Sequence, residues 1–373
     1  MSRFPERVES ISISGIREVF EAAGDDAINL GLGQPDFPTP SHIRAAAIEA
    51  IEAQDVDGYT PNMGVKPLRD AITSMYENRY GITHDPDAVI ATSGASQALH
   101  LAMQAHVHPG DDVLIPDPGF VSYDALTRLA DGTPVPLPLR DDLTLDPETV
   151  RDAITENTAA FVVNSPANPT GAVQSKADMQ EFAAIADEFD VLCISDEVYE
   201  YIIYDGEHYS PAQFSNTGSV VVISACSKTF SMTGWRLGWV LGEKERIERM
   251  LRVHQYAQAC ASAPAQYAAI AALTGPTEPV TTMVDAFAER RDIVLDGLAD
   301  ASLETPVPRG AFYVLPRVPD GWVEAVIAND IIVVPGEAFG NNGAGRARLS
   351  YATDEESLKS ALETIATVTK SLK

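Results

Sequence analysis

Short apolar runs alternate with segments long enough for a helix between residues 88 and 223, and this alternation constrains the fold more than any other feature of the sequence. Strands that are separated by helices usually pair in parallel, so the pattern predicts an α/β fold with a mostly parallel sheet. We expect strands at 88–92, 112–116, 135–139, 159–163, 191–195 and 219–223, and helices at 41–53, 66–80, 93–107, 121–130, 147–154, 176–189, 245–261 and 264–273.

The remaining sequence predicts a second, smaller region. The chain has 373 residues, which is enough for more than one core. A long helix at 281–298 is followed by strands near 311–315, 331–334 and 347–350 among helices, a mixture typical of an α+β domain. At the other end we expect a helix at 14–23 and a strand that begins at Ile28.

The charge of the chain restricts its partners and its solvent. There are 54 Asp and Glu against 26 Lys and Arg, a net charge of −28, which repels nucleic acid and anionic membranes. Such self-repulsion is screened in a halophilic cytosol, although an ordinary acidic enzyme is the alternative. The start, MSRFPERVES, has no apolar signal segment, and no apolar run has the length of a membrane span, so we expect a cytoplasmic protein.

The sequence contains no recognisable metal-binding or nucleotide-binding motif. Three cysteines, Cys193, Cys226 and Cys260, are an odd number without metal-ligand spacing, so we expect free thiols. The seven histidines form no H-E-x-x-H motif, and neither G-x-x-x-x-G-K-[ST] nor G-x-G-x-x-G is present. We therefore expect no metal site and no nucleotide site of these types.

A lysine follows the apolar run at 219–223 and is the strongest candidate for chemistry. Residues 224–238 read SACSKTFSMTGWRLG and contain Lys228 and Arg236. Burial lowers the pKa of a lysine and makes it a nucleophilic amine that can form a Schiff base, and the planar donors of arginine suit a phosphate. Pyridoxal phosphate carries both an aldehyde and a phosphate. The alternative is an exposed Lys228 with Arg236 paired to a carboxylate.

This stretch resembles the internal-lysine signature of class I and II aminotransferases, S-K-x-x-x-x-x-G-x-R-x-G, through Ser227, Lys228, Gly234, Arg236 and Gly238. The resemblance implies a fold-type I enzyme with pyridoxal 5′-phosphate on Lys228 and with Ser227 and Arg236 at the phosphate. It also implies an N-terminal arm and part of the small domain at 1–40, a large cofactor-binding domain at 41–275 and a small domain at 276–373.

Small residues at a strand-to-helix turn form a second match. Gly94, Ala95 and Ser96 follow the predicted strand at 88–92, where backbone N–H groups and the helix dipole can meet an anion. The resemblance places the cofactor phosphate there. A plain helix N-cap at Ser93 or Ser96 is the alternative explanation.

Four residues match motifs that surround the cofactor ring in the family. Phe120, in DPGFVSY, would stack on the ring; Asn168, in N-x-x-N-P-T-G, and Tyr199, in D-E-x-Y, would bind its phenolate oxygen. Asp196 ends an apolar run, and a buried carboxylate needs a cation. The resemblance provides one in the protonated ring nitrogen.

Three further matches concern the substrate and the partner subunit. Gly33, in G-x-P-D-F, would contact the substrate carboxylate through its backbone, and Arg348, before Leu-Ser-Tyr, would bind the α-carboxylate, while Arg346 would form a surface ion pair. Asn168 also belongs to the substrate set. Tyr59 matches a loop whose tyrosine reaches the phosphate across the interface of a homodimer with shared active sites.

The implied reaction is transamination between an L-amino acid and a 2-oxo acid, with Lys228, Asp196 and Tyr199 as the catalytic residues. A β/γ-lyase or decarboxylase on the same fold is the alternative, and a non-catalytic ligand sensor is a third reading. Two positions depart from the family: Ala225 replaces a phosphate-binding serine, and Ser96 replaces a lysine that binds the distal carboxylate in some aspartate-specific relatives.

Overall fold

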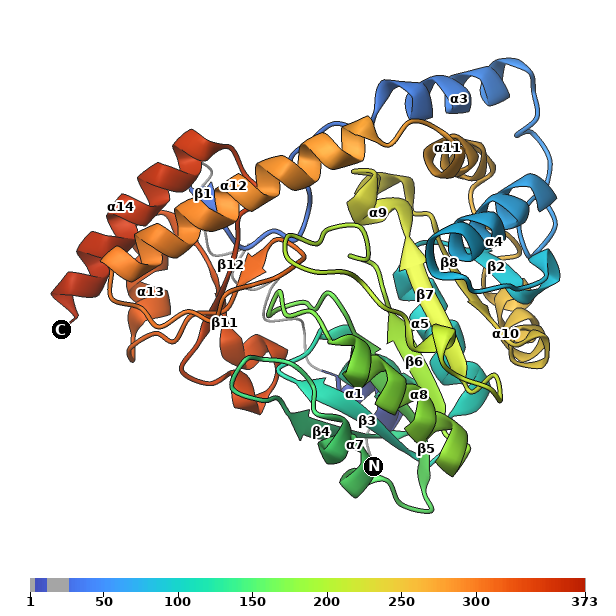
Figure 1. Ribbon diagram of the computed structural model, residues 1–373, viewed down its shortest axis with the longest axis horizontal. Helices are drawn as coiled ribbons and strands as arrows, with labels where there is room; N and C mark the ends of the chain where they lie inside the picture. The colour runs from blue at the N-terminus through green and yellow to red at the C-terminus, as the bar shows by residue number, and fades with distance from the viewer. Residues whose placement is uncertain (1–3, 12–26, 373) are drawn as a thin grey trace.

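The computed structural model describes residues 4–11 and 27–372, and the helix predicted at 14–23 lies outside them. Its main feature is a seven-stranded sheet with the order β2-β8-β7-β6-β5-β3-β4 (Figure 1). The strands are β2 (Val89–Thr92), β3 (Asp112–Asp117), β4 (Thr133–Pro138), β5 (Thr158–Asn164), β6 (Leu192–Asp196), β7 (Val220–Ala225) and β8 (Gly238–Gly242). From β7 to β4 every neighbouring pair is parallel, which confirms the predicted sheet.

Strand β8 was not predicted from the sequence. It pairs antiparallel with both β2 and β7. Its sequence, GWVLG, has only three apolar residues between two glycines, so the pattern is too short to indicate a strand. The position of β8 between two strands supplies the hydrogen bonds and the burial that its own sequence does not indicate.

Helices cover both faces of this sheet. They are α3 (Ser41–Glu52), α4 (Lys66–Tyr80), α5 (Ala95–His106), α6 (Ser122–Leu129), α7 (Pro147–Ala153), α8 (Lys176–Phe189), the one-turn α9 (Cys226–Thr229), α10 (Lys244–Ala257) and α11 (Ala263–Thr274). In β7, Val222 packs into a core with residues of α4, α8 and α11, whereas Val221 packs into a core with residues of α5 and α10. This alternation of side chains buries the strand on both faces.

The helix starts correct one expectation about capping. Gly94, with φ of 74°, is the N-cap of α5 in place of Ser93 or Ser96, and Pro40 is the N-cap of α3. Neither cap donates or accepts through a side chain. At the end of α4, Gly81 adopts the left-handed conformation with φ of 68°, which suits glycine because it has no Cβ.

The C-terminal part joins the beginning of the chain. It contains α12 (Glu278–Asp300), β9 (Tyr313–Val314), α13 (Trp322–Ile327), β10 (Ile331–Ile332), β11 (Val334–Pro335), β12 (Ala347–Ser350) and α14 (Glu355–Ser371). The predicted strand at 331–334 is divided, because β10 pairs with β1 (Ile28–Asn29) whereas β11 pairs with β12. Near the N-terminus α1 (Glu6–Glu9) lies beside α6.

A separate hydrophobic core holds this part together. Leu30, Phe287, Trp322 and Leu358 are buried in it together with Tyr199 from the segment that follows β6. Helix α12 runs from the side of α11 to α13 and α14, so it spans both parts of the molecule (Figure 1). The domain boundaries at residues 40 and 275 stay a prediction.

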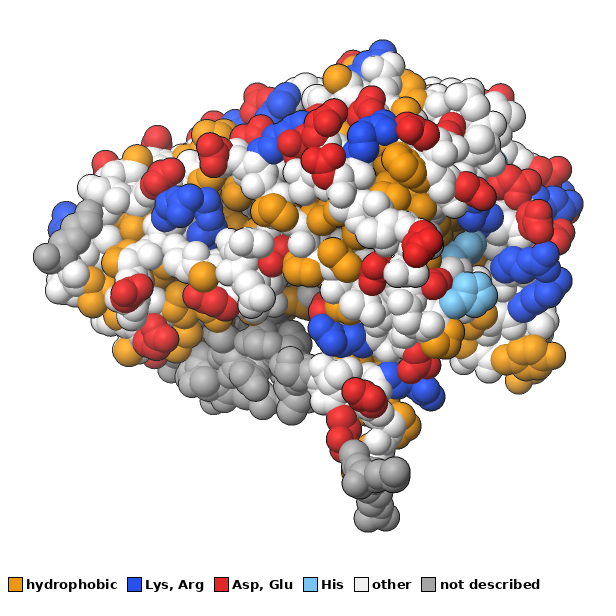
Figure 2. Space-filling view, turned by 90° about the horizontal axis from the view of Figure 1, so that it is seen from below, with side chains coloured by type: hydrophobic (Ala, Val, Ile, Leu, Met, Phe, Trp, Pro, Cys, Tyr) orange, Lys and Arg blue, Asp and Glu red, His pale blue; other side chains and the backbone are white. Residues whose placement is uncertain are grey.

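The surface is acidic, as the composition requires. Figure 2 shows Asp and Glu side chains scattered over the visible face, with Lys and Arg side chains among them. Among the described residues, no helix combines the length and the apolar character needed to cross a membrane.

Candidate active site

The candidate site is a cavity of about 250 Å³ at the carboxyl ends of the central strands. In an open α/β sheet this edge is where ligands usually bind. Asn164 ends β5, Asp196 ends β6 and Ala225 ends β7, and all three line the cavity. Of the predicted residues, the lining includes Gly33, Ala95, Ser96, Phe120, Asn168, Asp196, Tyr199, Ser227, Lys228, Arg236 and Arg348.

Lys228 enters this cavity from the one-turn helix α9, which follows β7 directly. Its Nζ donates a hydrogen bond to the carbonyl oxygen of Gly33 at 2.5 Å. Burial, followed by the positive charges of Arg348 and Arg236, lowers the pKa of the Lys228 amine to about 8. A substantial fraction of the amine is therefore neutral, and so nucleophilic, at mildly alkaline pH.

Asp196 is buried at the end of β6, and its carboxylate faces the cavity. Tyr123 donates its hydroxyl to Oδ2 at 2.7 Å, and the backbone N–H of Val198 donates to Oδ1 at 3.3 Å. Burial raises the pKa of Asp196 to about 6 against these hydrogen bonds. A cation bound next to this carboxylate would favour its ionised form.

The N-terminus of α5 and Arg236 form the anion-binding end of the cavity. Ala95 and Ser96 are the first residues of the helix, so their backbone N–H groups have no partner within it. Arg236 donates to the carbonyl oxygens of Thr233 at 2.9 Å and Ser93 at 3.4 Å. A Cβ on Gly94 would lie 2.5 Å from Arg236 Nη2 and would displace the guanidinium, and the φ of 74° also favours glycine at this position.

Arg348 extends from β12 and is 2% exposed. Its Nη1 donates to Oδ1 of Asn168 at 2.9 Å, and its Nη2 donates to the carbonyl oxygen of Gly31 at 2.6 Å. Its Nε has no hydrogen-bond partner among the described residues. A buried guanidinium that lines a cavity is suited to bind a carboxylate, because the two hydrogen bonds of Nη1 and Nη2 use only two of its five N–H donors.

Tyr199 and Phe120 lie on the lining with different surroundings. The hydroxyl of Tyr199 is 2.8 Å from the hydroxyl of Tyr313. The ring of Phe120 packs edge-on against Tyr123, with centroids 5.7 Å apart. Tyr313, Tyr123 and Gly31 were not predicted as site residues; Tyr123 belongs to the same DPGFVSY motif as Phe120, whereas no motif singled out Tyr313.

Two expectations have a different outcome from the rest. Tyr59 is 93% exposed and does not line the cavity of its own chain. Its predicted contact with the cofactor phosphate would therefore need the cavity of another subunit. Arg346 is wrong as a surface ion pair: it is 7% exposed and donates to the carbonyl oxygen of Leu315 at 3.0 Å. Arg346 precedes β12 and forms an isolated antiparallel bridge with Arg317, which places it inside the packed C-terminal part and not on its surface.

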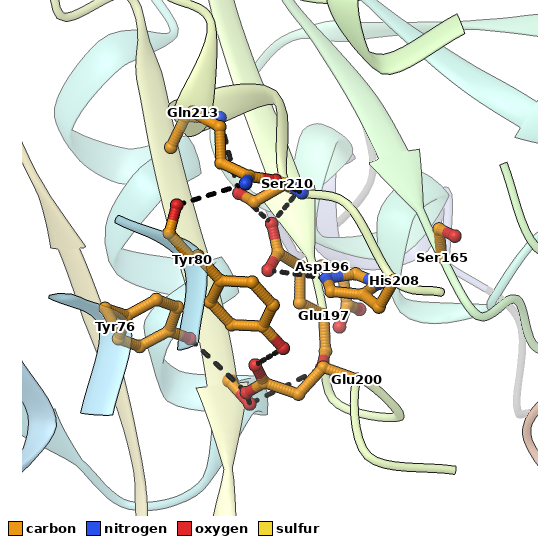
Figure 3. Close-up of polar contacts among 12 residues, drawn as sticks. Tyr76, Tyr80, Ser165, Asp196, Glu197, Glu200, His208, Ser210 and Gln213 are labelled. Atoms are coloured by element: carbon orange, nitrogen blue, oxygen red, sulfur yellow. Dashed lines mark hydrogen bonds and ion pairs between the residues drawn. The ribbon is translucent and has the colours of Figure 1, made fainter. Parts of the chain in front are cut away.

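A buried polar cluster adjoins Asp196 in the chain. Figure 3 shows Glu197 and Glu200 with His208 close to them, and one possible ligand atom from each of the three lies within 4.8 Å of the others. The oxygens of Glu197 accept from Ser195, Ser210 and His208, and those of Glu200 accept from Tyr76, Tyr80 and Ser224. These donors take three of the roughly four lone-pair sites of each carboxylate, so we assign the cluster to structure.

Comparison with known proteins identifies the family. The sequence family described as aminotransferase class I and II matches residues 25–365. The chain is 43% identical over 367 residues to a probable aspartate aminotransferase of Methanocaldococcus jannaschii, covering 95% of this chain and 97% of that protein. The chain therefore belongs to the class I and II aminotransferases.

Solved structures agree with this assignment. An aspartate aminotransferase from Thermus thermophilus with maleate superposes with a TM-score of 0.94 at 37% identity, covering 99% of this chain and all of the other. An aromatic aminotransferase from Pyrococcus horikoshii gives a TM-score of 0.90 at 39% identity, covering 96% and 99%. The protein is an aminotransferase of fold type I, and these comparisons give the lyase alternative no support.

Proposed function

We propose that this aminotransferase binds pyridoxal 5′-phosphate on Lys228 and moves an amino group between an L-amino acid and a 2-oxo acid. The family depends on this cofactor in general. One observation carries the proposal: the cavity that holds Lys228, with its lowered pKa, also holds Arg348, whose Nε has no partner among the described residues. A nucleophile for an aldehyde and a receptor for a carboxylate thus lie in one cavity.

The residues of the cavity fit each part of the cofactor. Ser227, Arg236 and the first N–H groups of α5 would hold the phosphate, and Gly94 leaves the space that Arg236 needs. Asp196 would bind the protonated ring nitrogen, because a buried carboxylate is stabilised by a cation. Phe120 would stack on the ring, and Asn168 and Tyr199 would bind its phenolate oxygen.

Two roles then follow for this chain's own groups. Arg348 holds the α-carboxylate of the amino acid, with Asn168 and Gly31 fixing the guanidinium through Nη1 and Nη2. The backbone of Gly33 borders the same space. When bound, the cofactor supplies an electron sink for the charge that develops at the α-carbon. Lys228, once its Nζ is free, removes the α-proton as a general base.

The substrates and the assembly belong to the same proposal. Relatives are named for aspartate and for aromatic amino acids, so we propose that the amino donor is one of these two classes. Ser96 stands where some aspartate-specific relatives carry a lysine, which disfavours an aspartate-specific site. We also propose a homodimer with shared active sites, in which Tyr59 reaches the partner's phosphate, and a cytoplasmic location, which the three free cysteines support.

A spectral experiment tests this function. Purified protein mixed with pyridoxal 5′-phosphate should gain the absorbance band of the lysine-bound cofactor, and the rate of attachment to cofactor-free protein should rise through about pH 8 as Lys228 loses its proton. Adding single amino acids should then discharge the band, most readily for the true donor. Lys228→Ala should fold but show neither the band nor turnover, whereas Lys244→Ala, at an exposed lysine, should behave as the unchanged protein.

Two results would contradict the proposal. An unchanged absorbance band in Lys228→Ala would place the cofactor on another amine. Ammonia release, or keto-acid formation in a single turnover without conversion of the cofactor to its amine form, would indicate a lyase.

A further inference from the structure

Tyr313 lies at the centre of the site, although neither the sequence motifs nor the roles given above involve it. It comes from β9, is 1% exposed and lines the cavity. Its hydroxyl is 2.8 Å from that of Tyr199, and its ring centroid is 4.6 Å from the guanidinium carbon of Arg348. Tyr313 therefore contacts both the residue proposed for the cofactor oxygen and the residue proposed for the substrate carboxylate.

We propose that Tyr313 is a positioning residue that sets the direction of the Tyr199 hydroxyl through its own hydroxyl and the plane of the Arg348 guanidinium through its ring. This inference rests on the proposed function, because it assumes that Tyr199 donates to the phenolate oxygen of the cofactor.

The hydroxyl part of the argument follows from counting protons. A phenol has one O–H, so in a pair of phenols only one donates to the other. If Tyr199 gives its proton to the cofactor oxygen, it must accept from Tyr313 at 2.8 Å. The resulting chain, from Tyr313 to Tyr199 to an anionic oxygen, is one in which each hydrogen bond polarises the next and strengthens it. Tyr313 thus makes Tyr199 a better donor.

The ring part concerns Arg348. The guanidinium carbon lies 4.6 Å from the ring centroid of Tyr313 and 4.7 Å from that of Phe339. Two aromatic contacts, together with the bonds from Nη1 and Nη2, hold the group in one plane, while each Nη keeps a second N–H and Nε has no partner among the described residues. A preorganised arginine loses less freedom when a carboxylate binds.

Gly33 explains why the pair can occupy this place. A Cβ at this position would overlap the Tyr313 hydroxyl, so the backbone of Gly33 packs directly against it. The same residue accepts the hydrogen bond from Lys228 Nζ through its carbonyl oxygen. The hydroxyl pair, the lysine and the arginine therefore share one small backbone segment, residues 31–33.

Tyr313→Phe separates the two parts, since it removes the hydroxyl and keeps the ring. In cofactor-loaded protein without substrate, we expect the pH midpoint of the absorbance change to move upward by roughly 0.2–1 pH unit, because a weaker donor stabilises the phenolate oxygen less. Tyr199→Phe should move it further in the same direction. The double variant should match Tyr199→Phe alone, because Tyr313 acts through Tyr199.

The KM for the amino donor tests the role of the Tyr313 ring. We expect KM for the amino donor to stay within twofold in Tyr313→Phe and to rise at least fivefold in Tyr313→Leu, which lacks the aromatic contact with Arg348. Tyr351→Phe is the matched control: Tyr351 is also fully buried, donates to the carbonyl oxygen of Ala311 at 3.5 Å and lies outside the cavity lining. It should change neither the spectral midpoint nor KM.

The outcomes distinguish this inference from the proposed function. If the unchanged protein shows no band of lysine-bound cofactor, the proposed function is wrong and the inference fails with it. If the unchanged protein titrates and Tyr313→Phe has the same midpoint, only the positioning role is wrong. An equal shift with and without Tyr199 would show that Tyr313 acts on the cofactor by a route other than the one proposed.

Discussion

Arg346 and Arg348 are separated by one residue of β12 and have different surroundings. Arg346 is bonded to a backbone carbonyl at the edge of a small sheet, whereas Arg348 lines the cavity and keeps its Nε without a partner among the described residues. Burial lowers the pKa of the Arg348 guanidinium, yet its ordinary value is so high that the group stays charged at any pH of interest. A buried, permanent positive charge of this kind needs an anion, and the substrate carboxylate is one.

We expect Arg348→Ala to raise KM for amino acids steeply, by an amount equivalent to about 2–5 kcal/mol for a desolvated charge pair. Steady-state kinetics on several donors measure the effect. Arg346→Ala is the control, and it should lower the free energy of unfolding while leaving KM close to its original value. A larger change in KM for Arg346→Ala would mean that the wrong arginine has been assigned.

The segment between β6 and β7 shows how one element positions several site residues. It directly follows Asp196 and contains Tyr199, and the buried carboxylate of Glu197 holds it together by accepting hydrogen bonds from Ser210 at 2.6 Å and His208 at 3.0 Å. These contacts join the start of the segment to residues more than ten positions later (Figure 3). The geometry of Asp196 and Tyr199 therefore depends on a cluster in which Glu197, His208 and Ser210 do not line the cavity.

Glu197→Ala should destabilise the protein by about 3–5 kcal/mol, because it leaves Ser195, Ser210 and His208 without their buried acceptor. Urea unfolding of the cofactor-free protein measures this loss. Glu207→Ala, at an exposed glutamate of the same segment, should change stability by less than about 0.5 kcal/mol. Equal stabilities of the two variants would contradict the structural role of the cluster.

At the scale of the whole molecule, the exposure of Tyr59 and the charge of the surface concern the environment of the chain, which includes other subunits and the solvent. Tyr59 is 93% exposed, which is unusual for a tyrosine that serves only packing. The chain has a net charge of −28, and Asp and Glu side chains are scattered over the face shown in Figure 2. The first observation points to a second subunit and the second to the ionic strength of the solvent.

Mixing two inactive or weakened variants tests the shared site. If Tyr59 serves the partner's cofactor, hybrids of Lys228→Ala chains with Tyr59→Phe chains contain one site in which both residues are unchanged, as a two-fold interface requires. We expect that site to regain the cofactor affinity that Tyr59→Phe homodimers lack. No recovery, or an active monomer at assay concentration, would mean that Tyr59 acts in its own chain or not at all.

The halophile hypothesis predicts that the protein loses stability as salt is removed. Repulsion between exposed carboxylates reaches further at low salt, because the Debye length grows from about 10 Å at 0.1 M to about 30 Å at 0.01 M. The melting temperature should therefore fall between molar and millimolar KCl. A flat dependence would indicate an ordinary acidic enzyme.

The sequence by itself determined the periodic elements and the motif residues. The helix at 66–80 and the helix at 176–189 have the predicted bounds, and Lys228, Asp196 and Asn168 line one cavity as their motifs implied. These predictions succeed because apolar periodicity and local backbone chemistry are encoded in neighbouring residues. The roles of the site residues stay a proposal until the variants are measured.

Only the tertiary structure decided the features that depend on residues far apart in the chain. Several features depend on segments that no local pattern connects. They are the antiparallel insertion of β8, the pairing of β1 with β10, the contact of Tyr313 with Tyr199 and the burial of Arg346. A short strand such as β8 or β9 forms because its neighbours provide hydrogen-bond partners and burial, and a polar side chain acquires its role from the groups that packing brings to it. The sequence motifs therefore predicted Lys228 and Arg348 as site residues, whereas only the folded structure shows that Tyr313 contacts both Tyr199 and Arg348.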